Sequence, residues 1–390
     1  MNILDEALAL KDEIVSIRRQ LHTYPELGFE LPNTTKLVFD KLLEYGCNPE
    51  RVGRSGVICD LGREGKTFLL RADMDALPMH ENSGLDFSSK NNNAHTCGHD
   101  AHTAMLLGAV KILKNNESQL NGCVRVIFQP AEEILAGADD MISNGILEAP
   151  KVSAAMALHI VTGIDYAHTG NIYSKAGAIT YSGDAIEISI VGKDAHGSTP
   201  NLGVDAIFIA SQVIIALQNV IAREIPPEEN AVLLVGKING GTSGNTVAGS
   251  ATLNISARAK SDLIRDFIKQ RIFEISTSIA EAFRGTSHVK FISGVPPLFN
   301  DPHLTESLES YCKEIIGCER VKKMDSFHGS EDFALIAKNV PSVLFTLGVG
   351  GRDEGYEYAL HHPSMRVNED ALPIGAAVYA GCALSWLRNN

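Results

Sequence analysis

The segment Phe68-Leu69-Leu70-Arg71-Ala72-Asp73-Met74-Asp75 is a short apolar run that ends in two acidic residues. Similar apolar runs recur along the chain, separated by segments with helical spacing of apolar residues. The other runs are Val57 to Leu61, Val124 to Phe128, Ala154 to Leu158 and Ser342 to Leu347, and the helical segments include Ala101 to Leu113 and Glu369 to Leu387. This alternation predicts an α/β fold with a mostly parallel sheet covered on both faces. Functional residues are then expected in the loops after the strands.

Between Gly183 and Gly294 the pattern changes to strand, helix, strand, strand, helix, strand, which predicts a ferredoxin-like α+β domain. The elements are expected at Ala185 to Val191, Val204 to Ile221, Ala231 to Ile238, Ala251 to Ala257, Asp262 to Phe283 and His288 to Ile292. Joints rich in Gly or Pro flank this segment, as expected of an insertion. We therefore predict a host domain at 1–182 and 295–390 and an inserted domain at 183–294.

The composition favours an ordinary globular protein. A formal net charge of -13 over 390 residues, without a cluster of Lys and Arg, argues against nucleic-acid or anionic-membrane partners. The acidic start from Met1 to Glu13 does not resemble a signal peptide, and no continuous span of about 18 apolar residues occurs. The seven cysteines, an odd number, suit a reducing compartment, so we expect a cytoplasmic location.

The pair Cys97 and His99 is the first sign of metal chemistry. Gly98 between them lets the backbone bend, so that a thiolate and an imidazole can converge on one cation. This pair of ligand types favours a borderline transition metal over Mg or Ca. Two other interpretations remain open at this point. The segment can be a helix start with incidental polar residues, or Cys97 can be the nucleophile of a thiol hydrolase, oriented through His99 and Asp100.

Further candidate ligands follow other apolar runs. In Gln129-Pro130-Ala131-Glu132-Glu133 the adjacent carboxylates must point in different directions, so one can bind a metal while the other acts as a base. His159 ends the run from Ala154, and His361 follows a Gly-rich loop. Each of these residues has an ordinary structural interpretation by itself. The sheet topology is expected to bring together five candidate ligands, namely Cys97, His99, Glu133, His159 and His361.

The ordered motifs of the chain resemble the di-metal aminoacylase and carboxypeptidase family, in particular its amidohydrolase branch with hippurate hydrolases and plant auxin-conjugate hydrolases. The resemblance runs nearly end to end. The matching motifs are His22 to Leu27, Arg71 to Pro78, Cys97 to Asp100 with His102-Thr103, Phe128 to Glu133, Ala195 to Pro200, Gly240 to Thr242 with Asn245, Gly329 to Phe333, and His361 with Pro363.

The resemblance implies a zinc-exopeptidase type of catalytic domain at 1–182 and 295–390, with 183–294 as a lid and dimerisation domain. It also implies a homodimer and two divalent metal ions, of Mn, Zn or Co. The implied metal ligands are Cys97, His99, Glu133, His159 and His361. Cys97 would bridge the two ions, with His99 and His159 completing one site, and Glu133 and His361 the other.

The resemblance also implies roles for residues that do not bind metal. Glu132 would be the general base for a metal-bridging hydroxide. Asp75 would orient a ligand, since Asp73 stands where the wider family has a histidine and His99 is expected to replace that ligand. His196, on the inserted domain, would stabilise the oxyanion in its own or a partner subunit, and Asn245 would assist in substrate binding.

The expected activity is hydrolysis of the amide bond of N-acyl amino acids, which releases a carboxylic acid and a free amino acid. The main rival is dipeptidase or exopeptidase action at the same site, followed by the thiol hydrolase built on Cys97. A non-enzymatic binding protein is a further alternative, which the presence of Glu132 and of a complete ligand set disfavours.

Overall fold

The computed structural model describes residues 2–390, which fold as two compact units. Of these residues, unit 1 comprises 2–177, Phe299–Asp325 and Leu335–Asn390, and unit 2 comprises Ala178–Leu298 and Ser326–Ala334. Unit 2 therefore consists of one long insertion and one short segment that returns to it. The returning segment is held inside unit 2 by backbone hydrogen bonds from Tyr181 N–H to Gly329 O and from Phe327 N–H to Ile179 O, each 2.9 Å long.

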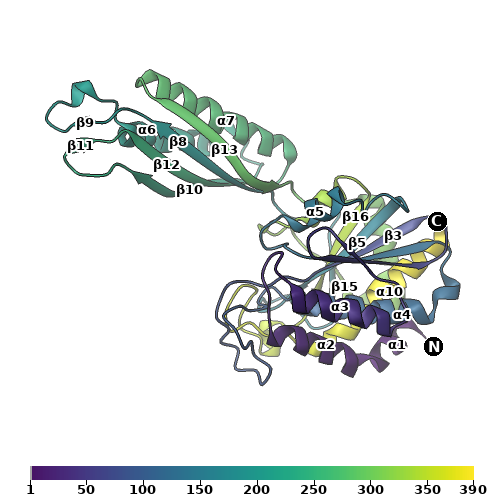
Figure 1. Ribbon diagram of the computed structural model, residues 1–390. Coiled ribbons are helices and arrows are strands. Elements are labelled where there is room, and N and C mark those ends of the chain that lie inside the picture. Colours follow the sequence, from purple (N-terminus) through teal and green to yellow (C-terminus); the bar gives the residue numbers. More distant parts are fainter. Residues whose placement is uncertain (1) are drawn as a thin grey trace. The chain divides into compact units, whose positions relative to one another are not determined.

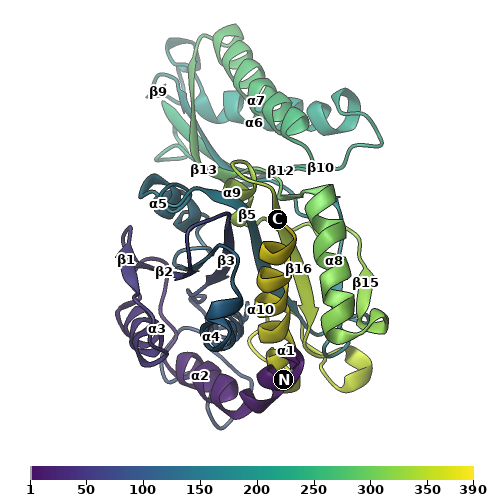
Figure 2. The same ribbon diagram turned by 90° about the vertical axis from the view of Figure 1, so that its right-hand side faces the viewer.

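Unit 1 is built on an eight-stranded sheet with the order β1-β2-β4-β3-β5-β16-β6-β15 (Figures 1 and 2). Its strands are β1 (Glu50–Val52), β2 (Gly56–Gly62), β3 (Thr67–Asp73), β4 (Cys123–Gln129), β5 (Val152–Val161), β6 (Ile172–Ser174), β15 (Val321–Lys323) and β16 (Ser342–Gly348). The neighbours β4, β3, β5 and β16 are parallel, whereas β1 and β2 are antiparallel additions at one edge and β6 runs antiparallel to β16. The prediction of an α/β fold with a mostly parallel central sheet is thus confirmed.

The central strands β3, β4 and β16 are buried along their whole length, which explains why they appear in the sequence as continuous apolar runs. The helices α4 (His99–Asn115) and α10 (Leu372–Asn389) lie side by side against β3 and β5 (Figure 2). The helices outside the inserted sheet are α1 (Ile3–Ala9), α2 (Lys11–Thr23), α3 (Pro32–Glu44), α4 (His99–Asn115), α5 (Gly137–Ser143), α8 (Pro302–Ile316), α9 (Phe333–Ala337) and α10 (Leu372–Asn389). Short 3-10 turns are η1 (Glu117–Gln119), η4 (Cys318–Arg320), η5 (Arg352–Glu354) and η6 (Glu369–Ala371).

Two helical segments, Ala206–Glu224 and Glu369–Asn389, are long and apolar enough to cross a membrane by length and composition alone. In the second segment, 89% of the 18-residue apolar window is buried, as expected of a core helix. The first packs one side against the sheet of unit 2 through Ile209, Val213 and Leu217. Core helices of this kind pass the same test as membrane spans, so these segments are weak support for a membrane role.

Unit 2 follows the order β8 (Gly183–Val191), α6 (Ala206–Asn219), β10 (Ala231–Gly240), β12 (Ser250–Ala259), α7 (Asp262–Ala282) and β13 (Thr286–Val295). The four strands form an antiparallel sheet with the order β10-β12-β8-β13, and α6 and α7 cover one face (Figure 1). Alternating burial along β8 and β12 reflects this one-sided cover. Shorter elements of unit 2 are β9 (Ala195–His196), η2 (Pro200–Leu202), the π-helical turn η3 (Val220–Glu224) and β11 (Thr246–Val247). Where the chain passes between the units, β7 (Gly177–Ala178) pairs with β14 (Phe299–Asn300).

Candidate metal centre

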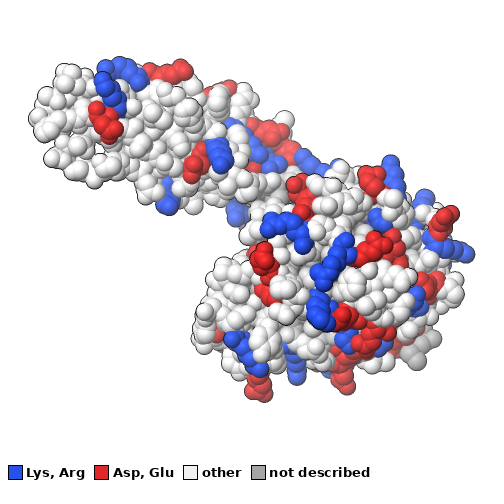
Figure 3. All heavy atoms as spheres, viewed as in Figure 1, with Lys and Arg blue, Asp and Glu red and all other residues white. Residues whose placement is uncertain are grey.

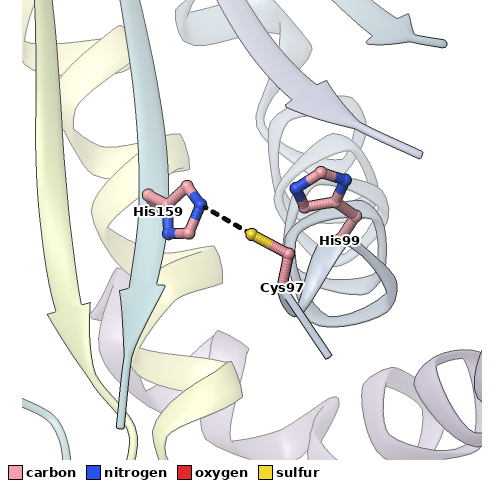
Figure 4. A group of neighbouring side chains, drawn as sticks. All are labelled: Cys97, His99 and His159. Atoms are coloured by element: carbon pink, nitrogen blue, oxygen red, sulfur yellow. Dashed lines mark hydrogen bonds between the residues drawn. The ribbon is translucent and has the colours of Figure 1, made fainter. Parts of the chain in front are cut away.

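Cys97 and His99 lie at the start of α4, where Gly98 makes the turn between them. Gly98 has a φ of 90°, in the left-handed region, and a Cβ at this position would collide with the side chain of Ile160. Only glycine therefore fits, and it brings both Cys97 and His99 into the protein interior. Figure 4 shows the sulfur of Cys97 pointing toward the ring of His159, with His99 beside it.

The sulfur of Cys97 is the common point of two groups of candidate ligands. Its Sγ lies 3.5 Å from His159 Nε2 and 3.2 Å from His361 Nε2. Cys97, His99 and His159 form one group whose ligand atoms all lie within 4.8 Å of one another, and Cys97, Glu133 and His361 form a second. The structure thus brings together all five candidate ligands, and every one of them belongs to unit 1.

The hydrogen bonds of His159 leave one ring nitrogen as an acceptor. His159 lies within β5, and its Nδ1 donates to the carbonyl oxygen of Ile160 at 2.7 Å. Because a carbonyl can only accept, Nδ1 carries the proton, and the lone pair of the neutral ring is on Nε2, which faces Cys97. Burial lowers the pKa of His159 to about 3. The ring is therefore neutral and suited to bind a cation.

His99 is fully buried, and within the described residues neither of its ring nitrogens has a hydrogen-bond partner. Its Nε2 lies 3.7 Å from Asp73 Oδ2 and 3.8 Å from Glu133 Oε1, and its Nδ1 lies 3.5 Å from Asp75 Oδ1. Burial lowers the pKa of His99, but the charges of Asp73 and Cys97 outweigh burial and hold it well above the ordinary value. Unpartnered nitrogens among carboxylates are the arrangement that a bound cation would satisfy.

Asp75 sets the directions of the two adjacent glutamates. Its carboxylate accepts hydrogen bonds from the backbone N–H groups of Glu132, at 3.0 Å, and of Glu133, at 3.2 Å. The preceding Ala131 has a φ of 56°, a strained conformation for a residue with a Cβ. Burial, with the charges of Asp75 and Asp73, raises the pKa of Glu133 to about 7. The loop is therefore held in one conformation at an energetic cost that a bound cation would offset.

His361 reaches the centre from the loop after β16, with a backbone φ of 64°. Its N–H donates to Thr96 O at 2.7 Å, so this loop is tied to the segment that carries Cys97. Its Nε2 lies 3.9 Å from Glu133 Oε2, and the side chain is 54% exposed. The centre is thus closed by buried groups on one side and open to solvent at His361.

The structure places His196 and Asn245 in unit 2, next to each other. His196 on β9 pairs with Thr246 on β11, and Gly197 N–H donates to Asn245 O at 2.7 Å. The backbone N–H of Ser198 donates to His196 Nδ1 at 3.1 Å, so Nδ1 is an acceptor and Nε2 carries the proton of the neutral ring. His196 is exposed in unit 2, whereas the five candidate ligands lie in unit 1.

The donor set fits a transition metal and not an activated thiol. A sulfur shared by two groups, three imidazoles and a carboxylate match the ligands preferred by Zn and similar first-row ions. Burial raises the pKa of the Cys97 thiol well above its ordinary value, and the charges of Glu133 and Glu132 add to this. A catalytic thiol needs a lowered pKa, so these surroundings disfavour the thiol-hydrolase interpretation.

Sequence reasoning gave His102 no role, although it lies against the centre. Its Nδ1 is 2.6 Å from Asp73 Oδ1, and its ring centroid is 4.6 Å from that of His159. The available signal was its spacing: three residues after His99 on α4, it lies on the same face of the helix.

Comparisons with known proteins agree with this geometry. Residues 69–385 match the model of peptidase family M20/M25/M40. An N-acetyl-L-cysteine deacetylase of Bacillus subtilis (strain 168) is 36% identical over 93% of this chain and 85% of its own length. A hippurate hydrolase of Campylobacter jejuni is 34% identical over 100% of both chains.

A solved structure with the same fold is described as a dinuclear metal-binding peptidase. The dinuclear metal-binding peptidase of the M20 family from Bacillus subtilis superposes with a TM-score of 0.82 at 30% identity, covering 98% of this chain and 99% of its own. The family match, the two relatives and this structure agree, and the resemblance noted from the sequence motifs is confirmed. The chain belongs to peptidase family M20/M25/M40, whose members are hydrolases.

Proposed function

We propose that the protein hydrolyses the amide bond of N-acyl amino acids with two divalent ions and Glu132 as the general base. The observation that carries this proposal is the different placement of the adjacent residues Glu132 and Glu133. Asp75 holds the backbone of both Glu132 and Glu133, while Glu133 joins the ligand group of Cys97 and His361. Glu132 Oε2 lies 3.9 Å from His99 Nε2, and Glu132 forms a further group of candidate ligands with His99 and Glu133. We assign it as the base because it belongs to neither of the two groups that contain Cys97.

The residues of the chain suggest the course of the reaction. When bound, the divalent ions would supply Lewis-acid chemistry and lower the pKa of a water molecule. Glu132 takes a proton from the attacking water and later returns it to the leaving amine. The Nε2–H of His196 supplies a hydrogen bond to the developing oxyanion, and Asn245 beside it assists in binding the substrate. Because His196 lies in unit 2, we propose that unit 2 of the same or of a partner subunit serves as a lid during the reaction.

The substrate class rests on the relatives. The names of the two related hydrolases contain N-acetyl-L-cysteine and hippurate, and both compounds are N-acyl amino acids. The rival is peptidase action on a dipeptide or a chain terminus, favoured by the name of the related Bacillus subtilis structure. The two reactions break the same kind of amide bond, so the walls of the substrate pocket decide between them.

Removal of metal is expected to abolish hydrolysis. The protein is dialysed against a chelator, and activity is measured on N-acetyl, N-benzoyl and indole-acyl amino acids and on dipeptides, before and after Mn²⁺, Zn²⁺ or Co²⁺ is restored. We expect activity to return with metal and to be highest on an acylated amino acid. Full activity after chelation would contradict the metal mechanism, and a clear preference for dipeptides would replace the deacylase with the peptidase.

We further propose that the active protein is a homodimer formed through unit 2. The strand β10 lies at an edge of its sheet and exposes Val232, Leu234 and Ile238, which are 43%, 56% and 47% exposed. The neighbouring α6 exposes Ile215 in addition. Figure 3 shows few charged side chains over the face of unit 2 that is in view. An apolar edge strand of this kind favours pairing with another chain, and a second copy is the partner proposed here.

A charge on the edge strand is expected to produce monomers. In Leu234→Glu the carboxylate would be buried on association, so sedimentation velocity should show a smaller species than for the unaltered protein. Leu43→Glu is the matched control, because Leu43 is 52% exposed on α3 of unit 1. A fully active monomer would rule out a role of His196 across subunits.

The cellular location is also a proposal. All seven cysteines are free thiols, and Cys312 and Cys382 form no disulfide although their sulfurs lie 3.7 Å apart. Free thiols at this distance suit a reducing compartment, so we propose the cytoplasm. Apart from a second copy of the chain, the proposed partners are small molecules and not nucleic acid or membrane, because acidic and basic side chains are intermingled on the face of unit 1 shown in Figure 3 and the net charge is -13.

A further inference from the structure

The parallel strands β3 and β5 separate beneath the candidate metal centre. Their pairing ends at Arg71 and Ala157, although both strands continue. On its other side β3 pairs with β4 as far as Asp73 and Gln129, and β5 pairs with β16 as far as Val161 and Gly348. The sheet therefore forks between β3 and β5, and the backbone groups that face the fork need other partners.

The hydroxyl of Tyr379 fills the base of this fork. Tyr379 lies on α10 and is completely buried. Its hydroxyl donates to Arg71 O on β3 and accepts from Leu158 N–H on β5, both at 2.8 Å. One side chain thus takes the place of the next rung of the ladder, directly before His159 in the sequence.

The ring of His102 bridges the fork one step further on. The backbone N–H of Ile160, on β5, donates to His102 Nε2 at 2.9 Å. The other nitrogen, Nδ1, then carries the proton of the neutral ring and donates to Asp73 Oδ1, at the end of β3, at 2.6 Å. His102 lies close enough to Asp73 and His99 to be considered a metal ligand. With both nitrogens engaged in these hydrogen bonds, however, it has no lone pair to offer.

We propose that Tyr379 and His102 are positioning residues that hold β3 and β5 apart and so place His159 opposite Cys97 and His99. Leu158 and Ile160, on either side of His159, are the two residues whose N–H groups these side chains bind. Hydrogen bonds on both sides fix the backbone of His159, and the ring of His102 packs against its imidazole. The inference rests on the metal centre of the proposed function and assigns the fork as the feature that shapes it.

The experiment compares four variants by metal binding, using Mn²⁺ alone in equilibrium dialysis, together with thermal unfolding of the metal-free proteins. In His102→Gln the amide retains one acceptor and one N–H donor, so it can still bridge the fork, but it is a poor ligand for a transition metal. His102→Ala removes the bridge. Tyr379→Phe removes only a hydroxyl. Tyr173→Phe is its matched control, because the Tyr173 hydroxyl also bonds two backbone groups, Tyr166 O and His168 N–H. Tyr173 lies on β6, two strands from β5 and outside the fork.

We expect Tyr379→Phe and His102→Ala to weaken Mn²⁺ binding by about 10- to 100-fold, the usual effect of losing a group that orients ligands. His102→Gln should bind as many ions as the unaltered protein and bind them more tightly than His102→Ala. Tyr173→Phe should bind Mn²⁺ like the unaltered protein, although its metal-free form also unfolds at a lower temperature. This contrast separates positioning from a general loss of stability.

Two results would overturn the proposal. If His102→Gln loses ions that the unaltered protein binds, His102 is itself a ligand. If Tyr379→Phe binds Mn²⁺ no more weakly than Tyr173→Phe, the fork does not shape the centre. The Tyr379 and Tyr173 pair decides the matter even if His102→Ala fails to fold. Absence of metal binding in the unaltered protein would instead contradict the proposed function itself.

Discussion

Replacing Glu132 with glutamine is expected to lower kcat by on the order of 10²- to 10⁴-fold, the range typical of a lost general base, while metal content stays unchanged. Glutamine keeps the size of the side chain and the backbone N–H that donates a hydrogen bond to Asp75, so the loop that carries residue 132 should retain its conformation. What it loses is the ability to take a proton from water. Steady-state kinetics on an N-acyl amino acid, with elemental analysis of the same sample, measures both quantities.

Two further variants make this result specific. Glu133→Gln should lose metal as well as activity, because Glu133 belongs to a ligand group with Cys97 and His361. Glu309→Gln is the control for a buried glutamate outside the centre. Glu309 bonds to Ser174 and Lys323, and its replacement should change stability without changing kcat. Near-normal turnover in Glu132→Gln would show that another group removes the proton.

The central strands could be predicted because burial on both faces leaves a continuous apolar run in the sequence. The run Phe68 to Ala72 corresponds to β3 (Thr67–Asp73), and Val124 to Phe128 corresponds to β4 (Cys123–Gln129). Edge strands do not have this property. The strand β15 (Val321–Lys323) is largely exposed, so its residues carry no apolar pattern. Apolar residues from Ile3 to Leu21 recur at helical spacing, which predicts one helix over the first ~20 residues. The structure has α1 and α2, interrupted at Leu10, because α1 packs on α10 and α2 on α4.

The convergence of the candidate ligands could be predicted from topology, since the ends of parallel strands meet at one edge of the sheet. His159 shows the limit of that reasoning. It lies inside β5, which continues to Val161 because β16 still pairs with it there. Its side chain can reach the centre only because β3 has already separated from β5. The separation of β3 from β5 depends on tertiary contacts such as the hydrogen bonds of the Tyr379 hydroxyl. The apolar sequence of α10 contains no local pattern that predicts these contacts.

The short segment Ser326–Ala334 belongs to unit 2 for a similarly long-range reason. The guanidinium of Arg258, on β12, donates to His328 O at 3.1 Å and to Ser330 Oγ at 2.9 Å. The ring of His328 also lies against Tyr181, with 4.8 Å between ring centroids. These contacts join residues about 70 positions or more apart in the sequence. Composition and periodicity describe only neighbours along the chain, so they could not indicate this return.

The replacement Cys97→Ala is expected to abolish activity and to weaken the binding of both metal ions, each by more than about 100-fold, because loss of a direct ligand should exceed loss of a group that merely orients one. The reason is that Cys97 is common to the group with His99 and His159 and to the group with Glu133 and His361. Equilibrium dialysis with Zn²⁺, followed by elemental analysis, measures the loss.

Cys123→Ala provides the control for this experiment, since Cys123 is also a buried free thiol, 7% exposed, but lies at the start of β4 away from the centre. It should keep its metal and its turnover. The decisive contrast is with the thiol-hydrolase mechanism, in which Cys97 attacks the substrate itself. That mechanism predicts that Cys97→Ala loses turnover but binds metal like the unaltered protein. Because burial raises the pKa of this thiol instead of lowering it, we expect metal and turnover to be lost together.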